Sequence, residues 1–189
     1  MNQLVYKIDH NVAVEKISLA PFKKGTKNEP TRFEIYLHAE RKDGMISRAE
    51  VGTNSPTWGS FSIISDEGKA IGGTDTAPAP LDYFTAGVGF CFLSHIAMYS
   101  RAVKLKIDKA DLELRMKFSV INNPDKIEEN GLQGKNEGLE FHLMVKSEEP
   151  EEKIRTMFDE CIRACLAIQS LTNPVPLNSH LHLNGIELT

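Results

Sequence analysis

Hydrophobic and polar residues alternate along several short stretches in the first half of the chain. Residues 33–39 carry apolar side chains at every second position, which is typical of a half-buried strand. The turn residues Arg41-Lys42-Asp43-Gly44 follow this stretch. Residues 45–52 and 60–65 are expected to form further strands, the latter closed by Asp66-Glu67-Gly68. The pattern therefore predicts an antiparallel meander.

The alternation returns, more cleanly, in the second half. Residues 112–120 and 139–145 each place apolar side chains on one face and polar side chains on the other. The segment between them, 122–138, is polar and contains glycine. These features predict a second antiparallel pair with a long connection. A last strand is expected around 180–188, whereas residues 1–31 give the weakest pattern.

Two segments have the pattern of helices instead. Residues 82–103 contain no proline and are apolar on every face, which predicts a helix surrounded by protein on all sides. The second helix begins near Glu149–Glu152, where acidic side chains favour the positive end of a helix. It continues as one apolar stripe at helical spacing, made of Ile154, Met157, Phe158, Cys161, Ile162 and Cys165.

A length of 189 residues suits a single domain, or one domain with an extension. One modest sheet cannot cover a helix that is apolar all round. We therefore expect either a sheet that wraps the helix or a second subunit that covers it, and a homodimer is the prediction.

Composition limits the partners and the location. The net charge is -4, so no nucleic-acid partner is expected. The longest apolar run, residues 83–99, is shorter than the roughly 20 residues that cross a bilayer, and no signal-peptide pattern opens the sequence. We therefore expect a cytoplasmic protein without membrane contact. Three cysteines are too few for a secreted disulfide scaffold.

Cys91 and His95 are four residues apart in the first predicted helix and so share a face. An imidazolium beside a thiol increases the proportion of thiolate, which is the reactive form. Free cysteine is also one of the most buried residue types. Spacing alone therefore favours two packed core groups and leaves a nucleophile as the alternative.

Cys161 and Cys165 have the same spacing in the second helix. A metal would need further ligands, and no second Cys/His pair stands at zinc spacing, although His180 and His182 alternate nearby. A distant thiol can also condense with a sulfenic acid to give a disulfide. Such chemistry would reduce a peroxide if a cation stabilised the thiolate. Arg41, Lys42 and Arg48 are available for this, although each one singly is better explained as a surface charge of a hairpin.

The stretch GGTDTAPAPLDYFTAGVGFC, residues 72–91, resembles the loop-to-helix signature of the OsmC/Ohr superfamily. CLAIQSLTNPVPL, from Cys165, resembles the later cysteine motif of that family. The order of elements also agrees over residues 33–188, with residues 1–31 as an N-terminal extension of a single domain, 1–189.

The resemblance implies an α+β fold, built as an intertwined homodimer in which antiparallel sheets enclose long cysteine-bearing helices. It also implies a thiol peroxidase that reduces organic hydroperoxides. Cys91 matches the peroxide-attacking cysteine and Cys165 the resolving cysteine, while Cys161 is an extra thiol. Arg41 is the nearest match to the family's catalytic arginine, and the resemblance implies no metal, flavin or haem.

Two positions depart from the family pattern. In the organic-hydroperoxide branch a glutamate follows the signature proline and holds the arginine, but Leu81 stands there in this chain. Other branches carry their acid at the position of Asp82, so the chain resembles the general OsmC-like group. Leu166 stands where the later motif has proline.

The leading hypothesis is therefore a peroxidase in which Cys91 becomes a sulfenic acid and Cys165 forms the disulfide, with Arg41 and His95 stabilising the thiolate. A small dithiol or a thiol protein would then reduce the disulfide. The alternative is a non-catalytic protein of the same fold that binds an apolar ligand at the dimer interface. Acyl transfer through Cys91 and His95 would need an oxyanion hole that the sequence does not display.

Overall fold

The structure is a computed structural model that describes residues 3–121 and 131–188. The chain divides into two compact units, Met1–Tyr83 and Phe84–Thr189. The single domain expected over residues 1–189 stays a prediction. The first unit contains a sheet of strands and the second contains strands and helices, which is the α+β fold class that the family resemblance implies.

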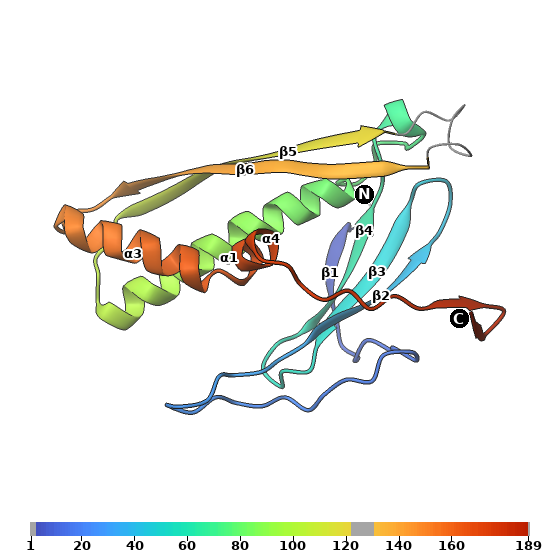
Figure 1. Ribbon diagram of the computed structural model, residues 1–189, viewed down its shortest axis with the longest axis horizontal. Helices are drawn as coiled ribbons and strands as arrows, with labels where there is room; N and C mark the ends of the chain where they lie inside the picture. The colour runs from blue at the N-terminus through green and yellow to red at the C-terminus, as the bar shows by residue number, and fades with distance from the viewer. Residues whose placement is uncertain (1–2, 122–130, 189) are drawn as a thin grey trace. The chain divides into compact units, whose positions relative to one another are not determined.

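The first unit contains one antiparallel sheet with the strand order β1-β4-β3-β2 (Figure 1). The strands are β1 (Val5–Ile8), β2 (Ile35–Arg41), β3 (Ser47–Thr53) and β4 (Ser60–Ser65). The predicted meander is therefore confirmed, with β2 two residues later than expected. The turn between β2 and β3 places Gly44 at φ 53°, a left-handed conformation that glycine adopts at little cost. Strand β1 was not predicted.

The second unit contains most of α1 (Pro80–Val103), the hairpin of β5 (Lys109–Ile121) and β6 (Gln133–Lys146), and the helices α3 (Glu151–Ala164) and α4 (Leu166–Thr172). A short hairpin of β7 (Leu181–Leu183) and β8 (Ile186–Leu188) ends it, where the sequence predicted one strand. The predicted connection 122–138 is too long, because β6 already begins at Gln133. Of that connection, residues 122–130 lie outside the described residues.

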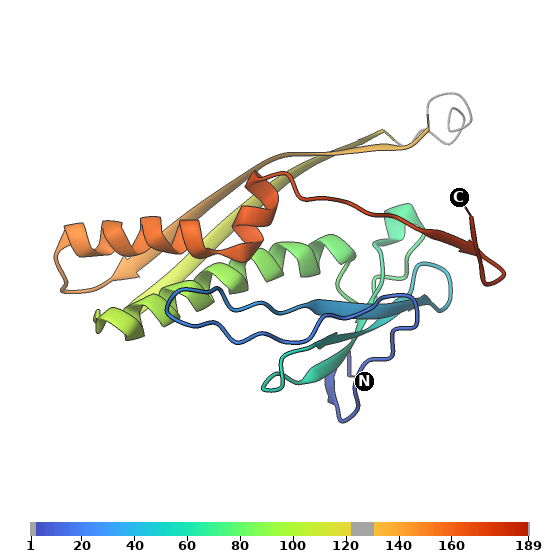
Figure 2. The same cartoon turned by 60° about the horizontal axis from the view of Figure 1, so that its bottom comes forward.

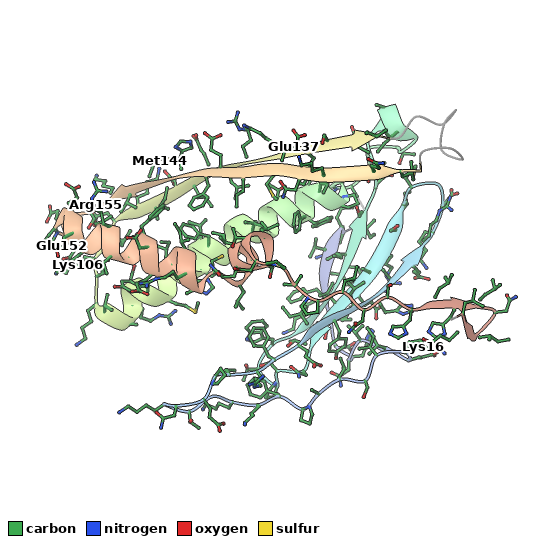
Figure 3. The ribbon with its side chains drawn as sticks, viewed as in Figure 1. Lys16, Lys106, Glu137, Met144, Glu152 and Arg155 are labelled. Atoms are coloured by element: carbon green, nitrogen blue, oxygen red, sulfur yellow. The ribbon has the colours of Figure 1, made fainter. Side chains whose placement is uncertain are left out.

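One face of the β5–β6 hairpin packs on α1 and α3, which run along it in both views (Figures 1 and 2). Leu114 pairs with Phe141 across the hairpin, and both side chains point to the core. Met144, on the opposite face, is exposed (Figure 3). The predicted period-two pattern is thus confirmed, since alternate residues divide between core and surface.

Three aromatic rings form the centre of this core. The ring of Phe92 on α1 lies 5.0 Å from that of Phe141 on β6 and 6.1 Å from that of Phe158 on α3, centre to centre. The inclined arrangements are those that aromatic pairs prefer. One residue from each layer therefore fixes α1, the hairpin and α3 against one another.

Helix α1 is only partly buried in this chain, although the sequence predicted burial all round. Val88, Phe92 and Ile96 are buried at helical spacing, whereas Phe90 is 69% exposed. The helix has 24 residues, more than the apolar run of the sequence suggested, and by length and composition it could cross a membrane. The length argument against a membrane span therefore does not hold, and the same features suit the central helix of a soluble protein.

Candidate thiol site

Two of the three cysteines meet a histidine inside the second unit. Cys91 and His95 come from α1, and Cys165 lies at the junction of α3 and α4. Their two sulfur atoms and one ring nitrogen all lie within 4.8 Å of one another. Cys165 is fully buried and the other two are partly exposed. The structure thus brings together three of the five residues that the sequence and the resemblance singled out.

His95 stands over Cys91 one helical turn later. Its Nδ1 donates a hydrogen bond to the carbonyl oxygen of Cys91, at 2.8 Å, and lies 3.9 Å from Sγ of the same residue. This hydrogen bond ties Nδ1 to the backbone of the same helix and so holds the ring next to the Cys91 sulfur. The ring therefore stays within reach of a weak hydrogen bond to the Cys91 sulfur.

Cys165 interrupts the second helical segment. Its backbone is extended, with φ -68° and ψ 106°, so that α3 ends at Ala164 and α4 begins at Leu166. Its N–H still donates to Cys161 O and its carbonyl accepts from Gln169 N, each at 2.9 Å. The sequence predicted one continuous stripe through Cys165, and no proline or glycine marked this break.

Burial raises the pKa of the Cys165 thiol, and Cys91 beside it acts in the same direction. The backbone N–H groups of Ile168 and Ala167, at the start of α4, oppose this effect, although neither forms a regular capping hydrogen bond with the sulfur. Burial is the larger influence. Cys165 is therefore held as a neutral thiol.

Cys161, the extra thiol, is as deeply buried as Cys165. Burial raises its pKa to about 11, with smaller contributions from Cys165 and Glu160. It lines a hollow of about 280 Å³ whose other lining residues are His95, Met98, Tyr99, Ala102, Glu160 and Ala164. Cys161 is thus a core residue that borders a largely apolar hollow on the other side of His95.

The loop before α1 is organised by Asp66, in the first unit. This buried carboxylate accepts hydrogen bonds from the backbone N–H groups of Glu67, Thr74 and Thr76 and from both threonine hydroxyls. The hydroxyl of Thr74 contributes most to a pKa of Asp66 well below the ordinary range. From the sequence, Asp66 was expected only as part of a turn. The signal in the sequence that could have indicated this role was the pair Thr74 and Thr76, two positions apart in the signature.

Asp82 caps the helix that carries Cys91. Its carboxylate accepts a hydrogen bond from the N–H of Ala79, at 2.9 Å, while the carbonyl of Ala79 accepts from the N–H groups of Asp82 and Tyr83. Pro80 occupies the first helical position, where it lacks a donor that would be unpaired anyway. This arrangement accounts for Asp82 structurally: as the third helical residue it accepts the hydrogen bond from the N-cap N–H, which is one half of a capping box, while Ala79 has no side-chain acceptor for the other half.

The predicted cations lie in the first unit. Arg41 donates from Nε to the carbonyl of Gly44 at 2.9 Å, within the β2–β3 turn, and Lys42 pairs with Glu40. Arg48 donates to Ser62 Oγ at 3.1 Å and to Glu50 at 2.8 Å. Each of these cations therefore has a local partner, and the assignment of Arg41 to the thiolate stays a prediction.

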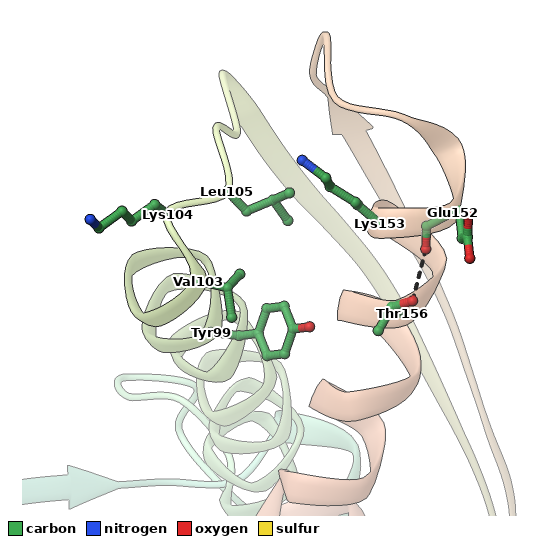
Figure 4. Close-up of a pocket in the computed structure, with 7 residues that line it drawn as sticks. All are labelled: Tyr99, Val103, Lys104, Leu105, Glu152, Lys153 and Thr156. Carbon is green, nitrogen blue, oxygen red and sulfur yellow. Dashed lines mark hydrogen bonds between the residues drawn. The ribbon is translucent and has the colours of Figure 1, made fainter.

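A separate hollow of about 420 Å³ lies near the end of α1 and the start of α3 (Figure 4). Tyr99 and Val103 line it from α1, and Thr156 lines it from α3, with its hydroxyl bonded to the carbonyl of Glu152. None of the three thiols lines this hollow. It therefore does not form part of the thiol site.

The chain belongs to the family of OsmC-like proteins, whose model matches residues 73–180. The matched region contains Cys91, His95, Cys161 and Cys165, so the resemblance drawn from the two cysteine motifs is confirmed. A search of curated proteins found no match.

Solved structures of the family share the fold. An OsmC-like hydroperoxide resistance protein from Jannaschia sp. CCS1 is 18% identical and has a TM-score of 0.53, over 82% of this chain and 97% of its own. An OsmC-like protein from Mycoplasma pneumoniae is also 18% identical, with a TM-score of 0.51 over 75% and 87% of the two chains. An organic hydroperoxide resistance protein from Elizabethkingia anophelis is 17% identical, with a TM-score of 0.51 over 75% and 90%.

Proposed function

We propose that this protein is a cysteine-based peroxidase that reduces organic hydroperoxides to alcohols. The observation that carries the proposal is the convergence of the Cys91 and Cys165 sulfur atoms with the ring of His95, within 4.8 Å. Names of structural neighbours, which include hydroperoxide resistance proteins, support the same class of reaction. A cytoplasmic location accords with the use of free thiols.

The reaction has two steps in the protein. The Cys91 thiolate attacks one peroxide oxygen, the O–O bond breaks, and the alkoxide leaves to be protonated as the alcohol. Cys91 is thereby oxidised to the sulfenic acid. The thiol of Cys165 then condenses with it, which forms the S–S bond and releases water. A small dithiol or a thiol protein supplies two electrons and two protons to restore both thiols.

The remaining residues have supporting roles in this proposal. Partly exposed His95 assists formation of the thiolate when its ring is protonated. Buried Cys165 stays a thiol and does not compete for peroxide, because its pKa is raised. Arg41 is proposed as the cation that stabilises the developing charge, on the strength of the family pattern, and Asp82 serves as a helix cap that keeps α1 in place.

We also propose that the functional unit is an intertwined homodimer. The exposed large apolar residues of α1 are Leu81, Phe84, Phe90, Met98 and Val103. A second copy would remove such a surface from water. Light scattering after size-exclusion chromatography tests this point, and a monomer at micromolar concentration contradicts it.

The experiment for the peroxidase is rapid mixing of the reduced protein with cumene hydroperoxide, followed by intact mass and measurement of the alcohol. The wild type should gain a disulfide and release one alcohol per chain. Cys165→Ser should complete a single turnover and hold Cys91 in an oxidised form, whereas Cys91→Ser should consume no peroxide. Cys161→Ser is the matched control and should behave as the wild type. An unchanged wild-type mass would overturn the proposal.

A second candidate function is the binding of an apolar ligand without catalysis, at the interface of two subunits. The apolar hollow bordered by His95 and Cys161 favours it, because it offers space for such a group next to the thiols. The pH dependence of iodoacetamide labelling distinguishes the two candidates. Labelling of Cys91 that persists well below pH 8.5, the ordinary range of a free thiol, supports the enzyme.

A further inference from the structure

The cluster of Cys91, His95 and Cys165 also has the composition of a metal site. Two sulfur atoms and one imidazole nitrogen are the donors that bind Zn²⁺ best in proteins. Within the described residues, this is the one group of three or more possible ligands that lie close together. The spacing in the sequence pointed instead to Cys161 with Cys165, and only the fold assembles the present set.

The geometry is close to that of a three-ligand zinc centre. Zinc binds sulfur at about 2.3 Å and nitrogen at about 2.0 Å, so tetrahedral ligands lie roughly 3.5–3.8 Å apart. Cys91 Sγ and His95 Nδ1 are already 3.9 Å apart, and no pair in the cluster exceeds 4.8 Å. Side-chain rotations that bring the ligand atoms about an ångström closer together would complete the site. The fourth coordination position of the zinc would stay open.

The surroundings suit entry and retention of the metal. Cys91 and His95 are partly exposed and provide a route from solvent, while buried Cys165 forms the floor. His95 Nδ1 now donates to the carbonyl of Cys91, so coordination needs the tautomer with its proton on Nε2. This shift releases no proton, whereas a cysteine that is still a thiol must lose its proton to bind zinc.

We propose that the reduced protein binds one Zn²⁺ through Cys91 Sγ, Cys165 Sγ and His95 Nδ1. The ion uses the same two sulfur atoms that form the disulfide of the proposed reaction. Metal binding and disulfide formation are therefore mutually exclusive, and zinc holds the protein in a form that cannot reduce peroxide. That consequence rests on the proposed function, but binding of the metal to the reduced protein does not.

Titration of the reduced protein with Co²⁺ under anaerobic conditions tests the site, because cobalt reports both its ligands and its geometry. A thiolate-to-cobalt absorption that saturates at one equivalent and disappears on addition of Zn²⁺ is expected. Absence of the absorption in the folded wild type would overturn the proposal.

Variants identify the ligands. Cys91→Ser and Cys165→Ser should each weaken zinc binding by more than about a hundredfold, and His95→Gln by at least about tenfold. Cys161→Ser is the matched control, since its thiol lies one turn from Cys165 but outside the cluster, and it should bind like the wild type. Equal losses in all four variants would overturn the assignment.

A measurement on the wild type alone tests the metal site even if the variants fail to fold. Zinc should protect Cys91 from N-ethylmaleimide, and unchanged labelling with zinc present would contradict the site. Oxidation by diamide, which takes two electrons from the two thiols, should abolish zinc binding. Zinc binding without peroxidase activity would reject the proposed function and keep the metal site. Peroxidase activity without zinc binding would keep the proposed function and reject the metal site.

Discussion

Phe92 and Phe90 stand two positions apart on α1 and have opposite surroundings. Phe92 is 1% exposed and its ring lies against those of Phe141 and Phe158, whereas Phe90 is 69% exposed. A single helix thus carries one phenyl ring at the centre of the core and another in contact with solvent in the single chain. Phe92 therefore represents the residues of α1 that stabilise the fold, and Phe90 represents those that are available to a second subunit.

Phe92→Ala is expected to lower the free energy of unfolding by about 3–5 kcal/mol, because it removes a ring that contacts two others and leaves a cavity. Chemical denaturation monitored by circular dichroism measures the loss. Phe90→Ala is the matched control within the same helix. If both substitutions reduce the stability of the monomer equally, the assignment of Phe92 to the core is wrong.

Phe90→Asp is expected to shift the protein from dimer to monomer, since a carboxylate would have to lose its water at an apolar interface. Light scattering at several concentrations records the shift. Lys153→Asp, on the exposed face of α3, introduces the same side chain in place of a surface residue and should leave the mass unchanged. A wild type and a Phe90→Asp variant of equal mass would contradict the proposed interface.

Asp66→Asn is expected to lower the melting temperature by several degrees at neutral pH. The folded state depresses the pKa of this carboxyl, so the stabilisation is complete above the ordinary pKa of about 4 and declines as the pH falls below it. The difference between wild type and variant should therefore shrink between pH 4 and pH 2. Thermal unfolding at a series of pH values measures it, and a difference that grows in acid would refute the role of Asp66.

Cys161 should resist alkylation in the folded protein. With a pKa raised to about 11, only about one thiol in a thousand is ionised at pH 8, and the side chain is buried as well. Labelling with iodoacetamide followed by peptide mass spectrometry should modify Cys91 well before Cys161, and denaturation in urea should equalise them. Faster labelling of Cys161 would show that the core opens readily around α3.

Periodicity predicted most of the regular structure. Strands β2 to β5 and helix α3 occur where apolar residues recur at the period of a strand or a helix, and α1 occurs where a proline-free run is apolar on every face. Strand β1 was missed because only four residues, Val5–Ile8, form it, in a segment of mixed character. The first six residues of β6, Gln133–Gly138, are polar with two glycines, and their strand conformation depends on pairing with β5.

The site could be predicted only in part. Cys91 and His95 share a helix, so their proximity follows from spacing alone, but Cys165 is 74 positions beyond Cys91 and its place depends on how α3 packs. The break at Cys165 has no local signal, since Leu166 carries no preference against continuing a helix. The five hydrogen bonds to Asp66 join residues up to ten positions apart, which a turn assignment does not reveal.

The backbone of Cys165 belongs to two helices at once. Its N–H is bonded to the last turn of α3 and its carbonyl to α4, while its own torsion angles are extended. We therefore expect a new bond to its sulfur to shift both helices, which carry buried Met157 and Ile168. Oxidation of the Cys165 sulfur, or binding of a metal to it, is in this way linked to the packing of α3 and α4 in the second unit.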